Sequence, residues 1–164
     1  MTSTPVAIAW FRQDLRISDN PALNAAAAAG DVLPIYILDD VNAAEWAMGA
    51  ASRAWLHHSL NALNLALDGR LRIFRGDARE IITQLVASLP VGGIFWNRCY
   101  EPWRIKRDAQ IKADLIAGDI QTRSFNAALL WEPWDISKKD GTPYRVFTPF
   151  YQKGCLSAPP PRQP

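Results

Sequence analysis

Three short polar segments hold the residues best suited to chemistry, and each follows an apolar run: residues 12–16, 39–46 and 97–103. Charges alternate in sign in the first segment, which favours an ion-pair and helix-capping network over a ligand site. Two adjacent carboxylates open the second; they could bind a metal, but no EF-hand spacing is present and a strand-end or capping role is favoured. The third places a carboxylate and the Asn97 amide among aromatic residues. Such a loop is either a clamp for a flat heterocycle with ring N–H groups or a solvated loop with packed aromatics.

The other candidates for catalysis or metal binding are weak. His57 and His58 are adjacent, so on a helix they point about 100° apart and cannot chelate one ion. Cys99 and Cys155 lack the C-x-x-C spacing of a zinc site and are too few for a disulfide framework. No G-x-G-x-x-G, P-loop or G-x-S-x-G pattern occurs, which disfavours a standard NAD or ATP site and serine hydrolase chemistry. The sequence predicts no catalytic residue and no metal-ligand set.

Apolar runs alternate with segments of helical period along the first 125 residues. Five runs are expected as strands, at residues 6–11, 32–38, 71–74, 94–96 and 120–125. Four intervening segments are expected as helices: Pro21 to Gly30, 52 to about 68 with Ser52 as the cap, Asp77 to about 89, and Pro102 to Gly118. Gly92 and Gly93 are expected to turn the chain into the fourth strand.

This order, strand and helix repeated four times and then a strand, predicts an α/β fold. We expect a Rossmann-like parallel five-stranded sheet in the order 3-2-1-4-5, with helices on both faces. Because such sheets bind ligands at the carboxyl ends of their strands, the polar segments after strands one, two and four are expected to form a site. On the last helix, the spacing places Ile105 on one side and Arg104 and Arg107 in solvent.

The composition is that of an ordinary globular protein. The chain has 164 residues, 49% of them hydrophobic and 21% charged, which is enough for one domain that needs no disulfide. Two cysteines suit the cytoplasm, which is the expected location. No apolar run approaches the roughly 20 residues that span a bilayer, and no signal-peptide pattern opens the chain. From about residue 129 the sequence becomes aromatic and Pro-punctuated and ends in a linker-like tail. We expect an α/β domain over residues 1–128, a connector over residues 129–164, and a longer natural protein.

Five segments, taken in order, resemble the N-terminal domain of the DNA photolyase and cryptochrome family. They are WFRQDLR with DNPAL (10–16, 19–23), SRAWL with SL (52–56, 59–60), GD (76–77), NRCYEPW with RD (97–103, 107–108) and YRVFTPF (144–150). The first and last are specific to the family, and the five together span nearly the whole chain. The SRAWL segment is most similar to plant-like members and related bacterial ones.

The resemblance implies a longer protein in which this antenna-type domain precedes a helical domain that binds FAD. In photolyases of the family, the photoexcited reduced flavin donates an electron to a cyclobutane pyrimidine dimer flipped out of DNA, and the dimer splits. We therefore expect part of a deoxyribodipyrimidine photolyase, a carbon–carbon lyase. The fragment alone is expected to be inactive, because the FAD and lesion pockets lie downstream.

The same resemblance implies the partners. They are the FAD-binding helical domain of the same protein and, through the whole protein, damaged DNA; we expect a monomer with no membrane contact. The alternative functions are a cryptochrome blue-light photoreceptor and, with less support, a stand-alone nucleotide-binding α/β protein.

The resemblance also implies a cleft for an antenna chromophore. The matching positions for cofactor binding are Leu38, Asp39, Ser52, Arg53, Glu101, Pro102 and Arg104. The family's deazaflavin pattern carries an arginine where this chain has Ser52 and a carboxylate where it has Cys99. The sequence therefore favours a reduced folate slightly over deazaflavin or flavin, with an empty cleft as the remaining alternative. FAD itself is expected only in the missing helical domain.

Overall fold

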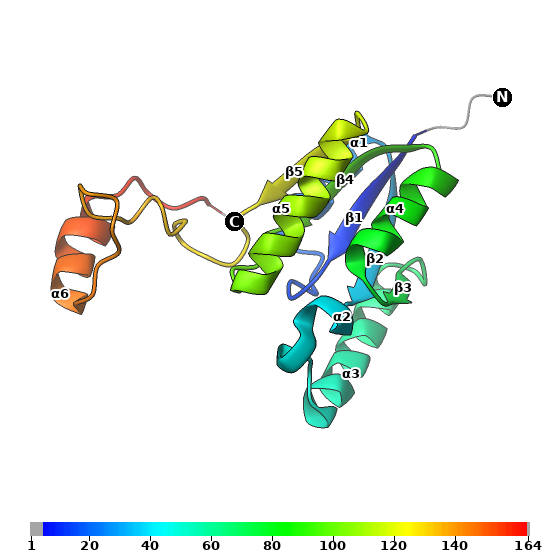
Figure 1. Cartoon of the computed structure of the whole chain (residues 1–164), viewed down its shortest axis with the longest axis horizontal. Helices are drawn as coiled ribbons and strands as arrows, with labels where there is room; N and C mark the ends of the chain where they lie inside the picture. The colour runs from blue at the N-terminus through cyan, green and yellow to red at the C-terminus, as the bar shows by residue number, and fades with distance from the viewer. Residues whose placement is uncertain (1–4, 164) are drawn as a thin grey trace. The chain divides into compact units, whose positions relative to one another are not determined.

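The computed structural model describes residues 5–163, and internal contacts divide the chain into two compact units, Met1–Ala127 and Ala128–Pro164. The first unit contains a parallel five-stranded sheet in the order β3-β2-β1-β4-β5 (Figure 1). The strands are β1 (Val6–Phe11), β2 (Asp31–Leu38), β3 (Arg72–Arg75), β4 (Val91–Asn97) and β5 (Gln121–Phe125). The main helices are α1 (Pro21–Ala29), α3 (Ala50–Ala66), α4 (Ala78–Ser88) and α5 (Pro102–Ala117). The predicted fold class and strand order are confirmed.

The central strand β1 is buried on both faces, as its continuous apolar sequence predicts. Ile8 and Trp10 point into a core closed by residues of α4 and α5. Ala7, Ala9 and Phe11 point into a second core closed by residues of α1 and α3. Two helices therefore cover each face of the sheet (Figure 1).

The predicted helix ends are partly confirmed. Asn20 caps α1 by accepting from the Leu23 N–H, and Asp77 caps α4 by accepting from two backbone N–H groups. The predicted Ser52 cap is wrong, because α3 begins at Ala50 after Gly49 and Ser52 lies exposed in its first turn. The predicted turn at Gly92 and Gly93 is also wrong, because β4 already begins at Val91 and contains both glycines.

The predicted faces of α5 are wrong as well. Ile105 is 52% exposed, whereas Arg107 and its neighbour Asp108 are buried together with Ile111 and Leu115. Asp39 and Asp108 accept hydrogen bonds from the Arg107 guanidinium beneath the helix, so the charge on this buried face of α5 is compensated. The arginine belongs to the interior of the fold rather than to its solvated face.

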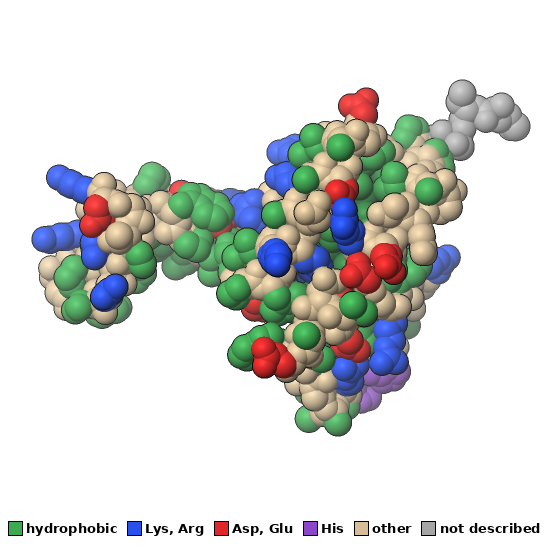
Figure 2. Space-filling view, viewed as in Figure 1, with side chains coloured by type: hydrophobic (Ala, Val, Ile, Leu, Met, Phe, Trp, Pro, Cys, Tyr) green, Lys and Arg blue, Asp and Glu red, His purple; other side chains and the backbone are tan. Residues whose placement is uncertain are grey.

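Three consecutive short helical turns lie at residues 147–157 of the second unit, which the sequence predicts as a connector without regular structure. They are α6 (Phe147–Pro149), η2 (Phe150–Gly154) and η3 (Cys155–Ser157). Gly154 is buried, and a Cβ added there would lie 2.8 Å from Ile136 Cγ2. Figure 2 shows apolar and basic side chains interspersed on the surface of this unit. Within residues 5–163, no helix is both long and apolar enough to cross a bilayer.

Candidate functional site

A cleft lies where the carboxyl ends of β1 and β2 meet the first turns of α5. Together with the solvent at its mouth it contains about 490 Å³ of space not occupied by protein atoms, of which about 50 Å³ can hold the centre of a water-sized sphere. The short helix α2 (Asp40–Ala43) and the following turn η1 (Ala44–Trp46) form its outer wall. Its lining includes Trp10, Arg12, Tyr36, Leu38, Asp39, Asp40, Trp46, Trp103, Arg104 and Arg107. This is the sheet edge that the sequence predicts as the site.

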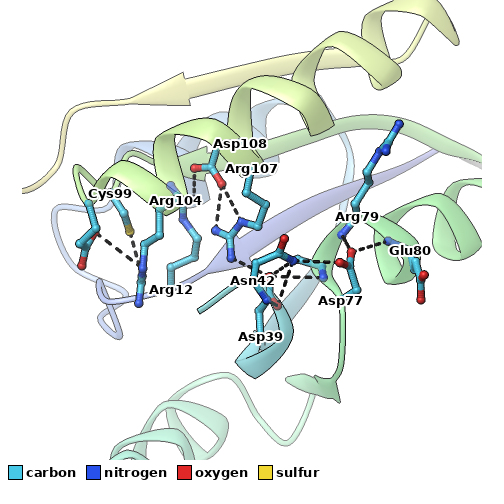
Figure 3. Close-up of polar contacts among 12 residues, drawn as sticks. Arg12, Asp39, Asn42, Asp77, Arg79, Glu80, Cys99, Arg104, Arg107 and Asp108 are labelled. Carbon is cyan, nitrogen blue, oxygen red and sulfur yellow. Dashed lines mark hydrogen bonds and ion pairs between the residues drawn. The ribbon is translucent and has the colours of Figure 1, made fainter. Parts of the chain in front are cut away.

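A chain of buried ion pairs forms the floor of the cleft (Figure 3). Arg107 donates to Asp108 Oδ1 through Nε and Nη2, at 3.1 and 2.9 Å, and to Asp39 Oδ2 through Nη1 at 3.0 Å. Asp108 also accepts from Arg12, whose second Nη donates to the Asn97 carbonyl. Two cations thus alternate with two carboxylates, so that no charge in the network is left uncompensated.

Asp39 holds the outer wall in place rather than presenting a free carboxylate. Its Oδ1 accepts from the Asn42 N–H at 3.0 Å and caps α2. The Asn42 side-chain amide donates both to Asp39 Oδ2 and to Asp77 Oδ2, at 2.9 Å each (Figure 3). The amide therefore links α2 to the N-terminus of α4. Arg107 also donates to Asp39 Oδ2, so both carboxylate oxygens of Asp39 already accept hydrogen bonds from within the fold.

The Asp40 carboxylate is likewise paired with other side chains of the fold. Arg53 of α3 donates to both of its carboxylate oxygens at 3.0 Å, and Arg75 lies 3.6 Å from Oδ2. This hydrogen-bonded pairing with Asp40 raises the pKa of Arg53. Among residues 5–163, no group of three or more His, Cys, Asp and Glu side chains could hold a metal ion. Both adjacent carboxylates thus serve the strand end and the helix that follows.

The segment after β1 forms the ion-pair and capping network that its alternating charges predict. Asp14 accepts from the Arg12 N–H at 2.9 Å and from the Asn97 amide at 2.5 Å. Asn97 also donates to Asn20 Oδ1 and accepts from the Ala22 N–H. Asn97 is therefore buried and fully engaged. Of the two alternatives for this loop, a heterocycle clamp therefore cannot use the Asn97 amide.

Arg104 and Glu101 stand at one end of the cleft, on the first turn of α5. Arg104 Nε lies 3.6 Å from Glu101 Oε2, and Nη1 lies 3.3 Å from Cys99 Sγ. Burial alone would raise the pKa of Glu101. Its own backbone N–H, the Arg104 cation and a 2.7 Å hydrogen bond from Gln13 outweigh burial and lower that pKa. Glu101 is therefore anionic at neutral pH.

Guanidinium groups and tryptophan rings alternate along the cleft. The Cζ atoms of Arg12 and Arg107 each lie 5.0 Å from the centroid of the Trp10 ring. The Cζ atoms of Arg107 and Arg104 lie 5.1 and 4.8 Å from that of Trp103. These distances are within the range of cation–π attraction. Arg107 therefore joins two aromatic residues that also line the cleft, and the lining offers flat apolar surface beside fixed positive charge.

The structure brings together only some of the positions that the resemblance indicates. Leu38, Asp39 and Arg104 line the cleft, and Ser52 lines an adjoining groove along α3 that shares Arg12, Tyr36 and Met48 with it. Arg53 and Glu101 contact lining residues without lining the cleft themselves, and Pro102 is exposed.

Sequence reasoning missed lining residues outside the three polar segments, among them Trp10, Tyr36 and Arg107. Tyr36 is the most informative of them. It is 5% exposed, and burial raises its pKa above 10.0 against the opposing influence of Arg104, so it is a neutral hydroxyl at ordinary pH. Its place two residues before the end of β2 is the signal that could have identified it.

The chain is similar to known proteins over nearly its whole length. The family model described as DNA photolyase matches residues 7–164. Cryptochrome-1 of Arabidopsis thaliana is 38% identical over 157 residues, which cover 93% of this chain and 23% of that protein.

Two crystal structures of photolyases share the fold. A bacterial class III photolyase from Agrobacterium tumefaciens is 38% identical, with a TM-score of 0.80, over 98% of this chain and 35% of that one. An archaeal photolyase from Sulfolobus tokodaii is 25% identical, with a TM-score of 0.73, over 92% of this chain and 35% of that one. The archaeal structure holds two FAD molecules, which implicate a novel light-harvesting cofactor in that protein. The chain thus spans about a third or less of the length of each of these three proteins.

Proposed function

Because this chain belongs to the DNA photolyase family, we propose that it is the N-terminal, antenna-type domain of a deoxyribodipyrimidine photolyase. The observation that carries the proposal is the family match over residues 7–164, combined with an aromatic cleft at the ligand-binding edge of the sheet. In the whole protein, a reduced FAD outside this chain supplies the light-driven electron that splits a cyclobutane pyrimidine dimer. The fragment itself carries no part of that step.

The contribution of this domain is to hold a light-harvesting chromophore in the cleft. Trp103 and Trp46 offer flat apolar surfaces, Tyr36 offers a neutral hydroxyl, and the ion pairs of Arg107 fix the floor. A lining of aromatic side chains with a few fixed polar groups suits a planar heterocycle. The light-harvesting cofactor implicated in the Sulfolobus tokodaii photolyase supports the assignment. We propose a reduced folate before deazaflavin or flavin, on the strength of Ser52 and Cys99.

A cryptochrome photoreceptor is the second candidate, because Cryptochrome-1 of Arabidopsis thaliana is 38% identical to the chain. Both functions use the same architecture, and a repair assay separates them. For either one, the FAD-binding helical part of the same protein is the proposed partner. We also propose that the protein is a cytoplasmic monomer. A photolyase further requires damaged DNA as a partner.

The test compares this chain with a longer chain that continues past Pro164. The longer chain is expected to purify with a flavin absorption band and to remove cyclobutane dimers from irradiated DNA under blue light but not in the dark. The 164-residue chain is expected to show no repair. A flavin band without light-dependent repair would favour the cryptochrome, and neither band nor repair would contradict both proposals. An additional near-UV band, with an excitation spectrum that sensitises flavin emission, would identify the antenna.

A further inference from the structure

Arg16, the last residue of the alternating-charge segment after β1, joins two parts of the chain that are 111 positions apart. Its Nη2 donates to the Ala127 carbonyl at 2.9 Å and to the Asp19 carbonyl at 3.0 Å. Its Nε donates to the Ser18 carbonyl at 3.2 Å. The guanidinium thus ties the loop between β1 and α1 to the segment that follows β5. Because β4 lies between β1 and β5 in the sheet, strand pairing does not already provide this contact.

The buried polar network at the carboxyl edge of the sheet holds the backbone of Arg16 in place. The Arg16 carbonyl accepts from Asn20 Nδ2 at 2.9 Å, and the Arg16 N–H donates to the Asp14 carbonyl at 2.7 Å. Asn20 is 1% exposed and also accepts from Asn97 Nδ2 at 2.7 Å. The guanidinium therefore projects from a fixed backbone, and its planar array of donors suits several carbonyls at once.

The loop that Arg16 holds contains an unfavourable backbone conformation. Asp19 has a φ of +45°, in the left-handed region that residues with a Cβ rarely adopt. The carbonyls of Ser18 and Asp19 belong to the two peptide groups that flank this residue, and both accept from Arg16. Arg16 therefore stabilises a strained loop and, through the same Nη2, holds Ala127 against it.

Ala127 is the residue at which the chain leaves the sheet domain, because it is the last one of the first compact unit. The chain just before it is also held, since the Phe125 carbonyl accepts from the Arg98 N–H at 2.8 Å. Residues 128–130, which follow it, are exposed. The hydrogen bond from Arg16 thus lies at the boundary between the folded sheet domain and the connector.

We propose that Arg16 is a positioning residue that fixes the point at which the connector leaves the α/β domain, and with it the placement of the flavin-binding part relative to the cleft. The inference rests on the proposed function, in which the connector leads to a part that holds FAD. Resonance energy transfer to a flavin falls steeply with distance and depends on the mutual orientation of donor and acceptor. Release of Ala127 therefore lowers the transfer even where both chromophores are fully bound.

The first test is limited proteolysis of the 164-residue chain with chymotrypsin under native conditions. This protease cleaves after leucine and aromatic residues, so cleavage after residues 129–131 reports opening of the chain at the boundary. Phe147, which is 72% exposed in the second unit, is the internal reference. Mass spectrometry identifies the cleaved bonds, and thermal melting verifies that each variant folds.

Four proteins are compared: the unchanged chain, Arg16→Met, Arg16→Lys and Arg70→Met. Arg70 is the matched control, because its Nε donates to the Leu67 carbonyl at 3.2 Å and its Nη2 to Asp68 Oδ2 at 3.2 Å. Its replacement removes the same charge and similar hydrogen bonds, but none that joins distant segments. Lysine keeps the charge without the planar fork of donors, so Arg16→Lys separates charge from geometry.

In Arg16→Met, we expect cleavage after residues 129–131 to become about threefold faster or more, because loss of a charge-assisted hydrogen bond shifts a local opening equilibrium by about that factor or more. Cleavage after Phe147 should stay unchanged, Arg70→Met should match the unchanged chain, and Arg16→Lys should lie in between. Unchanged cleavage after residues 129–131 overturns the inference. An equal increase at both sites also overturns it, because that is a general loss of stability. If Arg16→Met does not fold, Arg16→Lys decides by the same two comparisons.

The second test uses the longer chain that continues past Pro164. Its flavin emission is excited in the antenna band and divided by the measured content of both chromophores. Arg16→Met should lose part of this sensitised emission at unchanged chromophore content, Arg16→Lys should regain some of it, and Arg70→Met should keep all of it. Unchanged emission in Arg16→Met overturns the positioning role, even where cleavage shows that the boundary opens. Absence of an antenna band from the unchanged longer chain overturns the proposed chromophore and the optical part of this inference, while the cleavage rates still decide whether Arg16 fixes the boundary.

Discussion

Replacement of Arg107 by methionine should remove the cation at the centre of the buried ion-pair chain while keeping an apolar stem of similar length. Arg107 makes three hydrogen bonds to Asp39 and Asp108, whose side chains are 2% and 12% exposed. Loss of one partner of a buried pair typically costs about 3–5 kcal/mol, because it leaves a charge without compensation. Arg12 still faces Asp108 and Asn42 still donates to Asp39 in the variant. We therefore expect the lower end, about 3 kcal/mol.

The assay is urea unfolding at neutral pH, followed by circular dichroism and supported by thermal melting. For a chain of this size, about 3 kcal/mol corresponds to a fall in Tm of about 6–12 °C. Arg79→Met is the matched control, because Arg79 also donates two hydrogen bonds to one carboxylate of α5, at 2.5 and 3.1 Å to Asp114. That pair is largely exposed, so its loss should change stability little. The reasoning is refuted if the Arg107 variant loses no more stability than the Arg79 variant.

Four further outcomes follow from the described contacts. The fold lowers the pKa of Glu101, so ionised Glu101 stabilises the folded chain at any pH above the ordinary glutamate pKa. This stabilisation is lost as the pH falls through the lowered pKa. In urea titrations from pH 7 to pH 3, the difference in unfolding free energy between Glu101→Gln and the unchanged chain should therefore shrink. Asp77→Ala should cost about 1 kcal/mol in the same assay through loss of the α4 cap, and an unchanged midpoint would contradict that role. Tyr36→Phe should remove a step of the phenolate absorbance titration that lies above the ordinary tyrosine pKa, since burial raises the pKa of Tyr36, and a titration that keeps every such step would count against it. Gly154→Ala should place a methyl group 2.8 Å from Ile136 Cγ2 and speed protease cleavage within residues 128–164, whereas unchanged cleavage would show that the second unit tolerates it.

The sheet could be predicted because its information is local. The apolar runs, the Asn20 and Asp77 caps and the alternation of strand and helix each lie within a few residues of sequence. Strand order then follows from the handedness and shortness of the connections. The edge of the sheet that holds the cleft follows from the same topology.

The interior of the cleft could not be predicted, because its contacts join distant segments. Arg107 meets Asp39 across 68 positions and Arg12 meets Asp108 across 96. Hydrophobic periodicity predicts the buried face of a helix from its apolar residues alone. It therefore places an arginine on the solvent-exposed face even where, as for Arg107, the arginine is buried. The Asn97 amide failed as a ligand group for the same reason, since its partners Asp14 and Asn20 lie more than 70 positions away.

The ion-pair chain beneath the cleft also has a consequence for the order of folding. A partly formed network buries charges with fewer partners, so its four side chains stabilise the fold most when all are in place. Segments separated by 68 and 96 residues must meet first, and such distant contacts form late because loop closure opposes them. The carboxyl edge of the sheet should therefore close as one cooperative step at the end of folding. In native-state hydrogen exchange, the first turns of α2 and α5 should accordingly open together as a single unit.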